Sequence, residues 1–259
     1  MKTIYKDRLN TMIKFQKSIL FVIGILIVSS CASKKDILYF SDIKVNEQNN
    51  TVFSQGKIQA NDILSIIISS GSPDLASMYN LNQSNSAAMN GYLVALDGTI
   101  TLPILGKINV QDLTLLELEQ YLVKKIIDGK HLANPTVTVR LTNAKFTVLG
   151  EVKNPGTFTY NEQNISILQA LGYAGDLTIN GKRKDVLIIR EENNKRTYKT
   201  IDLTSKEWFD SPYYYIRPND VIYVNPNGPK VASSGYVPSL TNLLAIASIA
   251  ITTILLLTK

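Results

Sequence analysis

Acidic side chains are the first candidates for chemistry in this sequence. Two carboxylates held a fixed distance apart can cleave a glycosidic bond, one as the acid and one as nucleophile or base. All five candidates adjoin a glycine or asparagine turn signal, which favours hydrogen bonding to nearby backbone over catalysis. They are Asp62, Asp97, Glu151, Asp176 and Asp220.

The sequence gives little support for a metal site or for a catalytic nucleophile. The only histidine, His131, stands between a predicted helix and a predicted strand, and the only cysteine is Cys31. The usual zinc ligand sets and nucleophile pairs therefore cannot be assembled. The run GEVKNPG, residues 150–156, is not followed by the Gly-Lys-Ser/Thr of a phosphate-binding loop. We expect no catalytic residue, no metal site and no cofactor, and a protein that is not an enzyme.

A run of aromatic residues, SPYYYIRP, offers ring faces that could stack on sugars. Strand alternation would place Tyr213 and Tyr215 on one face and Tyr214 on the other. One face is then expected to join the core, and outward-facing tyrosines are candidates for carbohydrate or subunit contact.

Cys31 ends a leader-like sequence. Basic residues precede the apolar run Ile19 to Val28, and Ser29 and Ser30 follow it. This order is typical of a secretory signal, since the run is shorter than the roughly 20 residues of a spanning helix. Met12 is an alternative start. The block VSSC resembles the bacterial lipoprotein box, which implies a diacylglycerol on the Cys31 thiol; a buried cysteine in an anchor helix is the alternative.

The net charge of +6 lies mostly in that leader. Residues 1–30 carry +4, which leaves +2 for the rest of the 259-residue chain. This is too little to indicate a nucleic-acid partner. The hydrophobic fraction of 45% is sufficient for one or two compact cores.

A second apolar segment, residues 239–259, closes the chain without a charge before its last residue. As a helix, Leu240 to Leu257 would measure about 27 Å, close to the roughly 30 Å hydrocarbon core of a bilayer. Thr241, Ser248 and Thr252 fall on one stripe of that helix. Such a stripe suits helix packing or a wet lumen. A lone anchor whose hydroxyls bond their own backbone carbonyls is the alternative.

The elements that must position these residues mix strand and helix signals without a regular βαβ order, which predicts an α+β fold. Asp97-Gly98 lies between two alternating apolar runs and predicts a type I′ hairpin. Leucines at helical spacing from Leu115, with Thr114 and Glu117 in capping-box positions, predict a helix. We expect strands at ILSIIISS, PTVTVRL, KFTVLGEV, KDVLIIR, RTYKTI and DVIYVNP, and a short helix at ISILQALGYAG.

One local sequence occurs twice. IQANDILSI (58–66) and IRPNDVIYV (216–224) share Asn-Asp before an aliphatic run. Because asparagine tolerates left-handed geometry and aspartate can bond nearby amides, each copy predicts a turn into a strand. Chance recurrence of a common turn is the alternative to two related halves.

These motifs together resemble the bacterial outer-membrane polysaccharide export lipoproteins. The first half resembles the export domain of that family and the second its soluble-ligand-binding β-grasp domain. Two departures are Asp176 in place of the last glycine of an A-G-G motif, and Asn-Asp in place of Gly-Asp. Asparagine also reaches positive φ, so we expect the turns to survive. The motif residues that we expect to be structural are Asp97, Gly98, Ile100, Pro103, Gly106, Thr114, Glu117, Gly150, Glu151, Pro155 and Gly156.

The resemblance implies a domain order: a lipoprotein signal peptide at 1–30, a tether at 31–56, an export domain at 57–143, one β-grasp domain at 144–228, a linker at 229–238 and a C-terminal transmembrane helix at 239–259. It also implies a homo-oligomeric ring, of eight subunits, around a channel for capsular or exopolysaccharide.

The implied location is the outer membrane, with a lipid anchor and most of the body in the periplasm. The implied partner is an inner-membrane polysaccharide co-polymerase, which can be coupled to a tyrosine kinase. The alternative is a monomeric periplasm-facing lipoprotein whose β-grasp domain binds a soluble ligand. Oligomeric state distinguishes the two.

Overall fold

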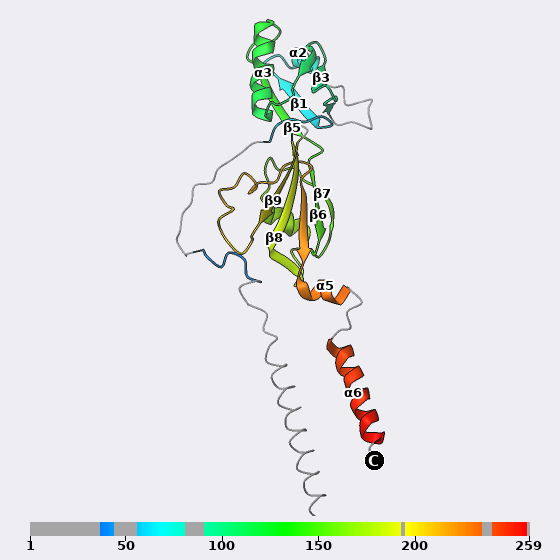
Figure 1. Ribbon diagram of the computed structural model, residues 1–259. Helices are drawn as coiled ribbons and strands as arrows, with labels where there is room; N and C mark the ends of the chain where they lie inside the picture. Colours follow the sequence, from blue (N-terminus) through cyan, green and yellow to red (C-terminus); the bar gives the residue numbers. More distant parts are fainter. Residues whose placement is uncertain (1–36, 44–55, 81–90, 193–194, 235–239, 258–259) are drawn as a thin grey trace, which may run out of the picture. The chain divides into compact units, whose positions relative to one another are not determined.

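The computed structural model describes residues 37–43, 56–80, 91–192, 195–234 and 240–257 (Figure 1). The chain divides into two units, 1–38 and 39–259, and every named helix and strand belongs to the second. The mixture of sheets and a few helices confirms the predicted α+β class. Its elements are β1 (Ile63–Ser69), α2 (Pro73–Ser77), β2 (Tyr92–Leu93), β3 (Thr99–Leu102), β4 (Gly106–Asn109), α3 (Leu115–Asp128), β5 (Thr136–Leu141), β6 (Lys145–Gly150), β7 (Gly156–Thr159), α4 (Ile167–Tyr173), β8 (Gly181–Glu192), β9 (Lys195–Ile201), β10 (Val221–Pro226), α5 (Gly228–Ser234) and α6 (Leu240–Leu257).

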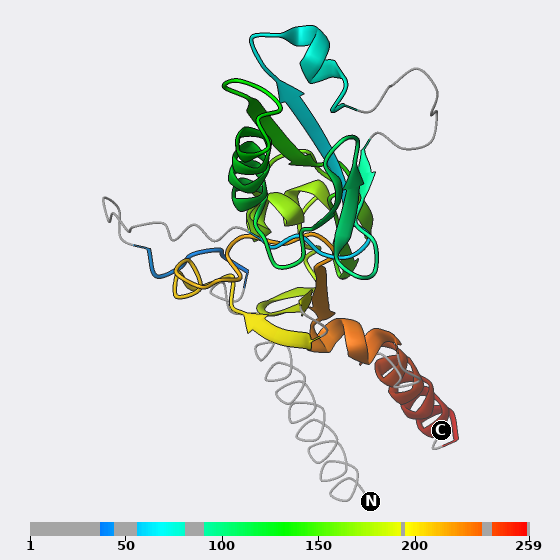
Figure 2. The same ribbon diagram turned by 90° about the horizontal axis from the view of Figure 1, so that it is seen from above.

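The part from residue 56 to 143 is built on an antiparallel sheet in the order β2-β1-β5. Helix α3 lies along this sheet (Figure 2) and buries Leu118, Leu122 and Ile126 completely. The predicted capping box is confirmed: Thr114 Oγ1 accepts the Glu117 amide at 3.2 Å, and Glu117 Oε2 accepts the Thr114 amide at 2.7 Å. Strands β3 and β4 form a separate two-stranded sheet.

The part from residue 144 onwards is a five-stranded mixed sheet in the order β7-β6-β10-β8-β9. Strands β6 and β10, the first and last of this sheet along the chain, are parallel neighbours, while the other pairs are antiparallel. This order, with helix α4 packed on the same core, is that of a β-grasp sheet. Phe146, Val148, Ile188 and Ile222 form the centre of the core and are completely buried.

The type I′ prediction at Asp97-Gly98 is wrong. That turn requires positive φ at both central residues, but of the two only Gly98 has it, at 73°. The Gly98 amide instead bonds the Ala95 carbonyl at 2.9 Å, and the Ala95 amide bonds the Thr99 carbonyl at 2.9 Å. The turn is therefore three residues long and ends in a glycine bulge, because aspartate stays in the ordinary region.

A short segment before the first domain docks on the β-grasp part. The Phe40 and Ser41 amides donate to the carbonyls of Leu203 and Thr204 at 3.2 and 2.8 Å. The Phe40 ring packs against Phe209, with ring centroids 5.3 Å apart. This part of the expected tether is thus fixed to the fold.

The C-terminal expectation needs a correction. Helix α6 forms where the sequence predicts a helix, but no helix among the described residues is long and apolar enough to cross a membrane. The transmembrane assignment of 239–259 is therefore not supported. Helix α5 occupies most of the segment predicted as a linker, and its Lys230 ammonium lies 3.9 Å from the Glu151 carboxylate.

Candidate functional site

The export-half motif builds two consecutive turns. Asp97 Oδ1 accepts the Thr99 hydroxyl at 2.6 Å, and Oδ2 accepts the Lys107 ammonium at 2.7 Å across the β3–β4 hairpin. The bond from Lys107 is the main reason that the pKa of Asp97 is lowered to about 2. The Asp97 carboxylate is therefore held by structural partners. The second turn follows Pro103 and joins β3 to β4. It ends at Gly106, the first residue of β4, which has φ 69°.

The β-grasp motif shapes the junction between β6 and β10. Gly150 has φ 88°, and a Cβ atom there would lie 2.1 Å from the Val224 carbonyl oxygen. Glu151 accepts the Thr178 hydroxyl at 2.8 Å. Pro155 ends the loop and Gly156 begins β7. The motif therefore allows two backbones to approach closely, which only glycine permits.

The departures from the family pattern keep the turn geometry. Asp176 has φ 71°, and its Oδ1 accepts its neighbour's amide and the Tyr39 hydroxyl. Asn61 and Asn219 have φ 71° and 67°, as the sequence predicts for asparagine in a glycine position.

The two Asn-Asp turns are built alike. Asp62 Oδ2 accepts the Gln59 amide at 2.8 Å, and Asp220 Oδ2 accepts the Arg217 amide at 2.8 Å, three residues back in each case. Both carboxylates are buried, with exposed fractions of 6% and 1%. Asp220 also pairs with Arg190, whereas no lysine or arginine among the described residues lies within 4 Å of Asp62.

Burial has a measurable consequence at Asp62. It raises the pKa of the Asp62 carboxyl to about 6, although the Gln59 amide acts in the opposite direction. Of the five candidate carboxylates, this is the one that the described chain leaves with the most unused hydrogen-bonding capacity.

The remaining sequence candidates fall outside any reactive arrangement. His131 lies in the loop after α3, exposed, with its ring edge against Tyr79 at 5.9 Å. Among the described residues, no three histidine, cysteine or acidic side chains gather as metal ligands. Cys31 lies outside the described residues.

The tyrosine run is irregular rather than a strand, so the predicted alternation of its faces is wrong. Tyr214 stacks on Trp208 at 5.6 Å, and Tyr213 lies under the Arg190 guanidinium at 4.6 Å. All three tyrosines, 213–215, are half-buried. Arg190 belongs to β8, which is distant in sequence from the tyrosine run. The alternation of residues within the run therefore could not predict this contact.

The hydroxyls of α6 bond within their own helix. Ser248 Oγ donates to the Ala245 carbonyl at 2.8 Å, and Thr252 Oγ1 donates to the Ser248 carbonyl at 2.7 Å. This is the arrangement that the lone-anchor alternative describes. The side chain of Thr241 lies outside the described part of the structure.

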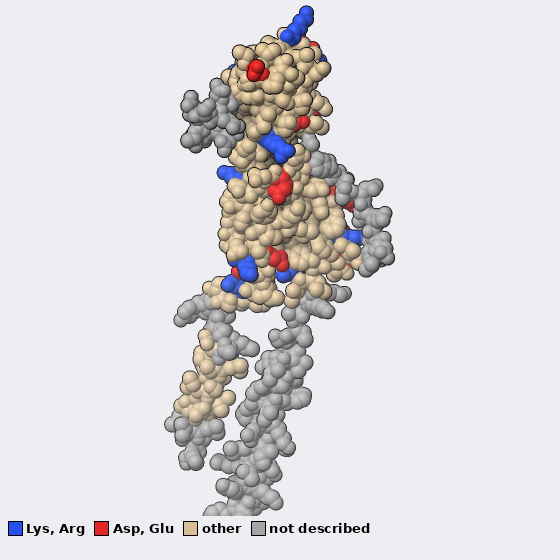
Figure 3. Space-filling model, turned by 180° about the vertical axis from the view of Figure 1, so that it is seen from behind, with Lys and Arg blue, Asp and Glu red and all other residues tan. Residues whose placement is uncertain are grey.

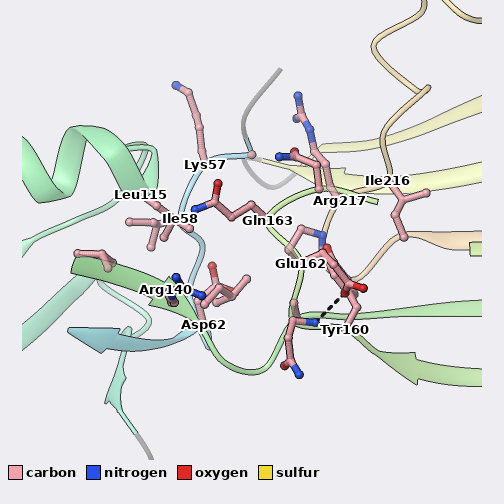
Figure 4. A pocket seen from close by; sticks show the side chains of 17 residues that line it. Lys57, Ile58, Asp62, Leu115, Arg140, Tyr160, Glu162, Gln163, Ile216 and Arg217 are labelled. Carbon is pink, nitrogen blue, oxygen red and sulfur yellow. Dashed lines mark hydrogen bonds between the residues drawn. The ribbon is translucent and has the colours of Figure 1, made fainter. Parts of the chain in front are cut away.

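Sequence reasoning did not predict a pocket that is lined by residues of both parts of the second unit (Figure 4). Its cavity volume is about 80 Å³. Asp62 and Arg140 line one side, and Tyr160, Glu162 and Arg217 line the other. Residues about 100 positions apart meet here, and only the Asn-Asp turn gave a signal of it.

The face drawn in Figure 3 adds no second candidate. On the face in Figure 3, basic and acidic side chains are scattered singly among uncharged residues. This agrees with the small net charge outside residues 1–30.

Comparison with known proteins now assigns the two parts. Residues 50–142 match the family described as Polysaccharide biosynthesis/export protein, and residues 145–199 match the SLBB domain. The chain belongs to the polysaccharide export family. The resemblance stated from the motifs is thus confirmed.

Two curated members of the polysaccharide export family are similar to this chain. Both are named EPS I polysaccharide export outer membrane protein EpsA. The one from Ralstonia solanacearum is 25% identical over 183 residues, covering 66% of this chain and 48% of the relative. The one from Ralstonia nicotianae is 25% identical over 181 residues, covering 65% and 46%. The chain spans about half the length of these relatives. Their names describe export proteins, not enzymes.

Proposed function

We propose that this chain is a subunit of an outer-membrane apparatus that exports capsular or exopolysaccharide from the periplasm to the cell surface. The observation that carries the proposal is the succession of the two matched domains, 50–142 and 145–199, in a chain similar to polysaccharide export outer membrane proteins. The described carboxylates support a non-enzymatic role, since all five candidates accept hydrogen bonds from structural partners.

The proposed location is the periplasmic side of the outer membrane, with Cys31 lipidated. The supporting observation is the order of basic, apolar and small residues before the only cysteine. A lipid anchor that begins with two acyl chains would suffice for stable attachment.

The proposed assembly is a ring of identical subunits around the polysaccharide path, eight in number by analogy with the family. Large apolar side chains that are exposed in the isolated chain, such as Leu96 at 85% and Ile179 at 67%, are candidates for contacts between copies. An inner-membrane co-polymerase, with or without a tyrosine kinase, is the proposed partner that delivers the polysaccharide.

For α6 we propose that the stripe of Thr241, Ser248 and Thr252 is a helix-packing face. Its described hydroxyls are already bonded within the helix, so a second helix could approach without leaving them unpaired.

The test is complementation of a deletion strain. Wild-type protein should restore surface polysaccharide, and Cys31→Ser should fail to incorporate labelled lipid and restore little. Negative-stain images of the detergent-extracted protein should show rings with a central cavity. Full polysaccharide secretion by the deletion strain would contradict the export role, and discrete monomers would favour the ligand-binding alternative.

A further inference from the structure

We propose that residues 39–42 form a releasable strap, which sets the length of free tether between a lipidated Cys31 and the folded chain. The inference rests on the proposed lipidation of Cys31 and adds to it a device that controls reach. The strap lies against the loop that follows β9 (Figures 1 and 2). It belongs to none of the sheets.

The strap is attached through local contacts. Besides its two backbone bonds to the loop, Ser41 Oγ donates to the Thr204 carbonyl at 3.0 Å. The Asp42 carboxylate accepts the Ser205 hydroxyl and the Lys206 amide, both at 3.0 Å. The described residues on either side of the strap are exposed. A segment held in this way can open without unfolding of the core.

Docking of the strap leaves two buried donors without acceptors. Arg183 Nε and Trp208 Nε1 bond no acceptor among the described residues, and these two residues are only 7% and 5% exposed. The Arg183 guanidinium lies 5.3 Å from the centre of the Tyr39 ring, and the Trp208 ring lies 6.2 Å from that of Phe40. A buried donor without a partner is costly. Release of the strap removes the two rings beside these donors, so that water can pair them.

The backbone of the strap is also strained. Phe40 has φ 52°, a left-handed conformation that is an outlier for a bulky residue. Such strain persists only where the surrounding contacts hold it, and it is found in segments that switch. Release relaxes this strain. The docked and released states are therefore closer in free energy than the contacts of the strap alone suggest.

Release changes the reach of the lipid anchor. While the strap is docked, eight positions separate Cys31 from Tyr39, whose hydroxyl donates to Asp176. An extended chain of that length spans at most about 30 Å. After release, the next described contact with the fold is the bridge of Lys57 with Thr114. Lys57 is 26 positions from Cys31, a span of up to about 90 Å.

The first experiment is native-state hydrogen exchange of the full-length protein in detergent, read by NMR. The Phe40 and Ser41 amides should exchange at least about 100-fold faster than the amide of Ile222, which is completely buried, because opening of the strap does not require global unfolding. The Ser41 amide should exchange about fivefold more slowly in Phe40→Gly than in Phe40→Ala, because glycine relieves the left-handed strain. Strap amides as slow as that of Ile222 would overturn the release, and equal rates in the two variants would overturn the strain.

The second experiment is energy transfer from Trp208, the only tryptophan, to a dansyl lipid. The lipidated protein is placed in phosphatidylcholine vesicles, and the tryptophan lifetime is measured with and without the dansyl lipid. Phe40→Ala with Asp42→Ala should release the strap and lower the transfer severalfold. Ile43→Ala, at an exposed position beside the strap, is the control and should leave the transfer unchanged. Equal transfer in wild type and the double variant would overturn the tether role.

Attachment and secretion are scored separately. Wild-type protein that does not stay on the vesicles would overturn both the lipid anchor and the tether role. Secretion by cells that carry the double variant tests the export role, whereas neither hydrogen exchange nor energy transfer depends on secretion. Failure of the strap and failure of the proposed function therefore give different results.

Discussion

Arg190 donates from Nε and Nη2 to the two carboxylate oxygens of Asp220, at 3.0 and 2.8 Å. Both side chains are almost completely buried. The guanidinium also donates to the carbonyls of Pro212 and Tyr215, at 3.1 and 2.9 Å. One ion pair thus ties the β8–β10 ladder to the irregular tyrosine run.

Removing one partner of this pair should be strongly destabilising. Asp220→Ala leaves the Arg190 guanidinium buried without a counterion, which typically costs about 3–5 kcal/mol. The free energy of unfolding, from urea titration, measures it. The control is Arg196→Ala, which breaks an exposed pair with Glu191 and should cost at most about 1 kcal/mol. Similar losses for the two variants would contradict a structural role for the buried pair.

The raised pKa of the Asp62 carboxyl predicts that its contribution to the free energy of unfolding falls as the pH rises. A carboxylate that is paired with a cation shows the opposite dependence. The Asp62 pKa of about 6 exceeds the ordinary value, so the folded protein binds more protons than the unfolded chain between about pH 4 and pH 6. The contribution of this group to stability is therefore greatest below that window and is lost as the pH rises through 6.

Asp62→Asn should remove this dependence while keeping an acceptor for the Gln59 amide. We expect the variant to be more stable than wild type at pH 7.5 by about 1–3 kcal/mol and equally stable at pH 4. Thermal unfolding at the two pH values measures both. A variant less stable than wild type at pH 7.5 would refute the assignment of the raised pKa.

Gly150 should not tolerate a side chain. Gly150→Ala places its Cβ against the Val224 carbonyl and forces alanine to φ 88°, so we expect a loss of about 3 kcal/mol or more. Gly156→Ala is the matched control, since the nearest atom to its new Cβ is Phe158 Cζ at 3.9 Å. Urea unfolding of the two variants should separate them clearly, and near-equal midpoints would contradict the close approach of β6 and β10.

Phe40 should hold the N-terminal segment on the β-grasp part. Phe40→Ala removes its contacts with Phe209 and Trp208, each worth about 0.5–1.5 kcal/mol. We expect faster limited proteolysis between residues 37 and 43, with the remaining chain resistant. Ile43→Ala, at an exposed position of the same segment, is the control. Unchanged cleavage in Phe40→Ala would mean that the backbone bonds alone secure the segment.

Bulk on the α6 stripe tests its proposed role in packing. Ser248→Phe with Thr252→Phe should impair secretion while the protein remains lipidated. Leu243→Phe with Ile246→Phe adds similar bulk on the other side of the helix, at exposed apolar residues, and should be tolerated. Normal secretion by the first double variant would exclude the stripe as a contact face.

Local signals predicted local structure well. The Thr114 capping box and the leucine spacing of α3 are set within one helix, so they could be read directly. The left-handed φ of Asn61 and Asn219 follows from residue type in the same way.

Features set by distant residues could not be predicted. The tyrosine run is ordered by Arg190 and Trp208, and no periodicity encodes those contacts. The pocket in Figure 4 is lined by both Asp62 and Tyr160, which lie 98 positions apart in the sequence. At Asp97-Gly98 the dipeptide signalled a turn, but the bond from the Ala95 amide to the Thr99 carbonyl makes the loop three residues long and so decides its type.

The two Asn-Asp turns allow a buried carboxylate with an arginine partner to be compared with one without, in the same protein. Asp62 and Asp220 share a side chain, a backbone bond from the residue three positions back and near-complete burial, and differ in whether an arginine is added. The difference between Asp62→Asn and Asp220→Asn therefore measures, within one protein, what a counterion is worth to a buried carboxylate. One turn uses its charge to hold the fold together, and the other keeps its charge available.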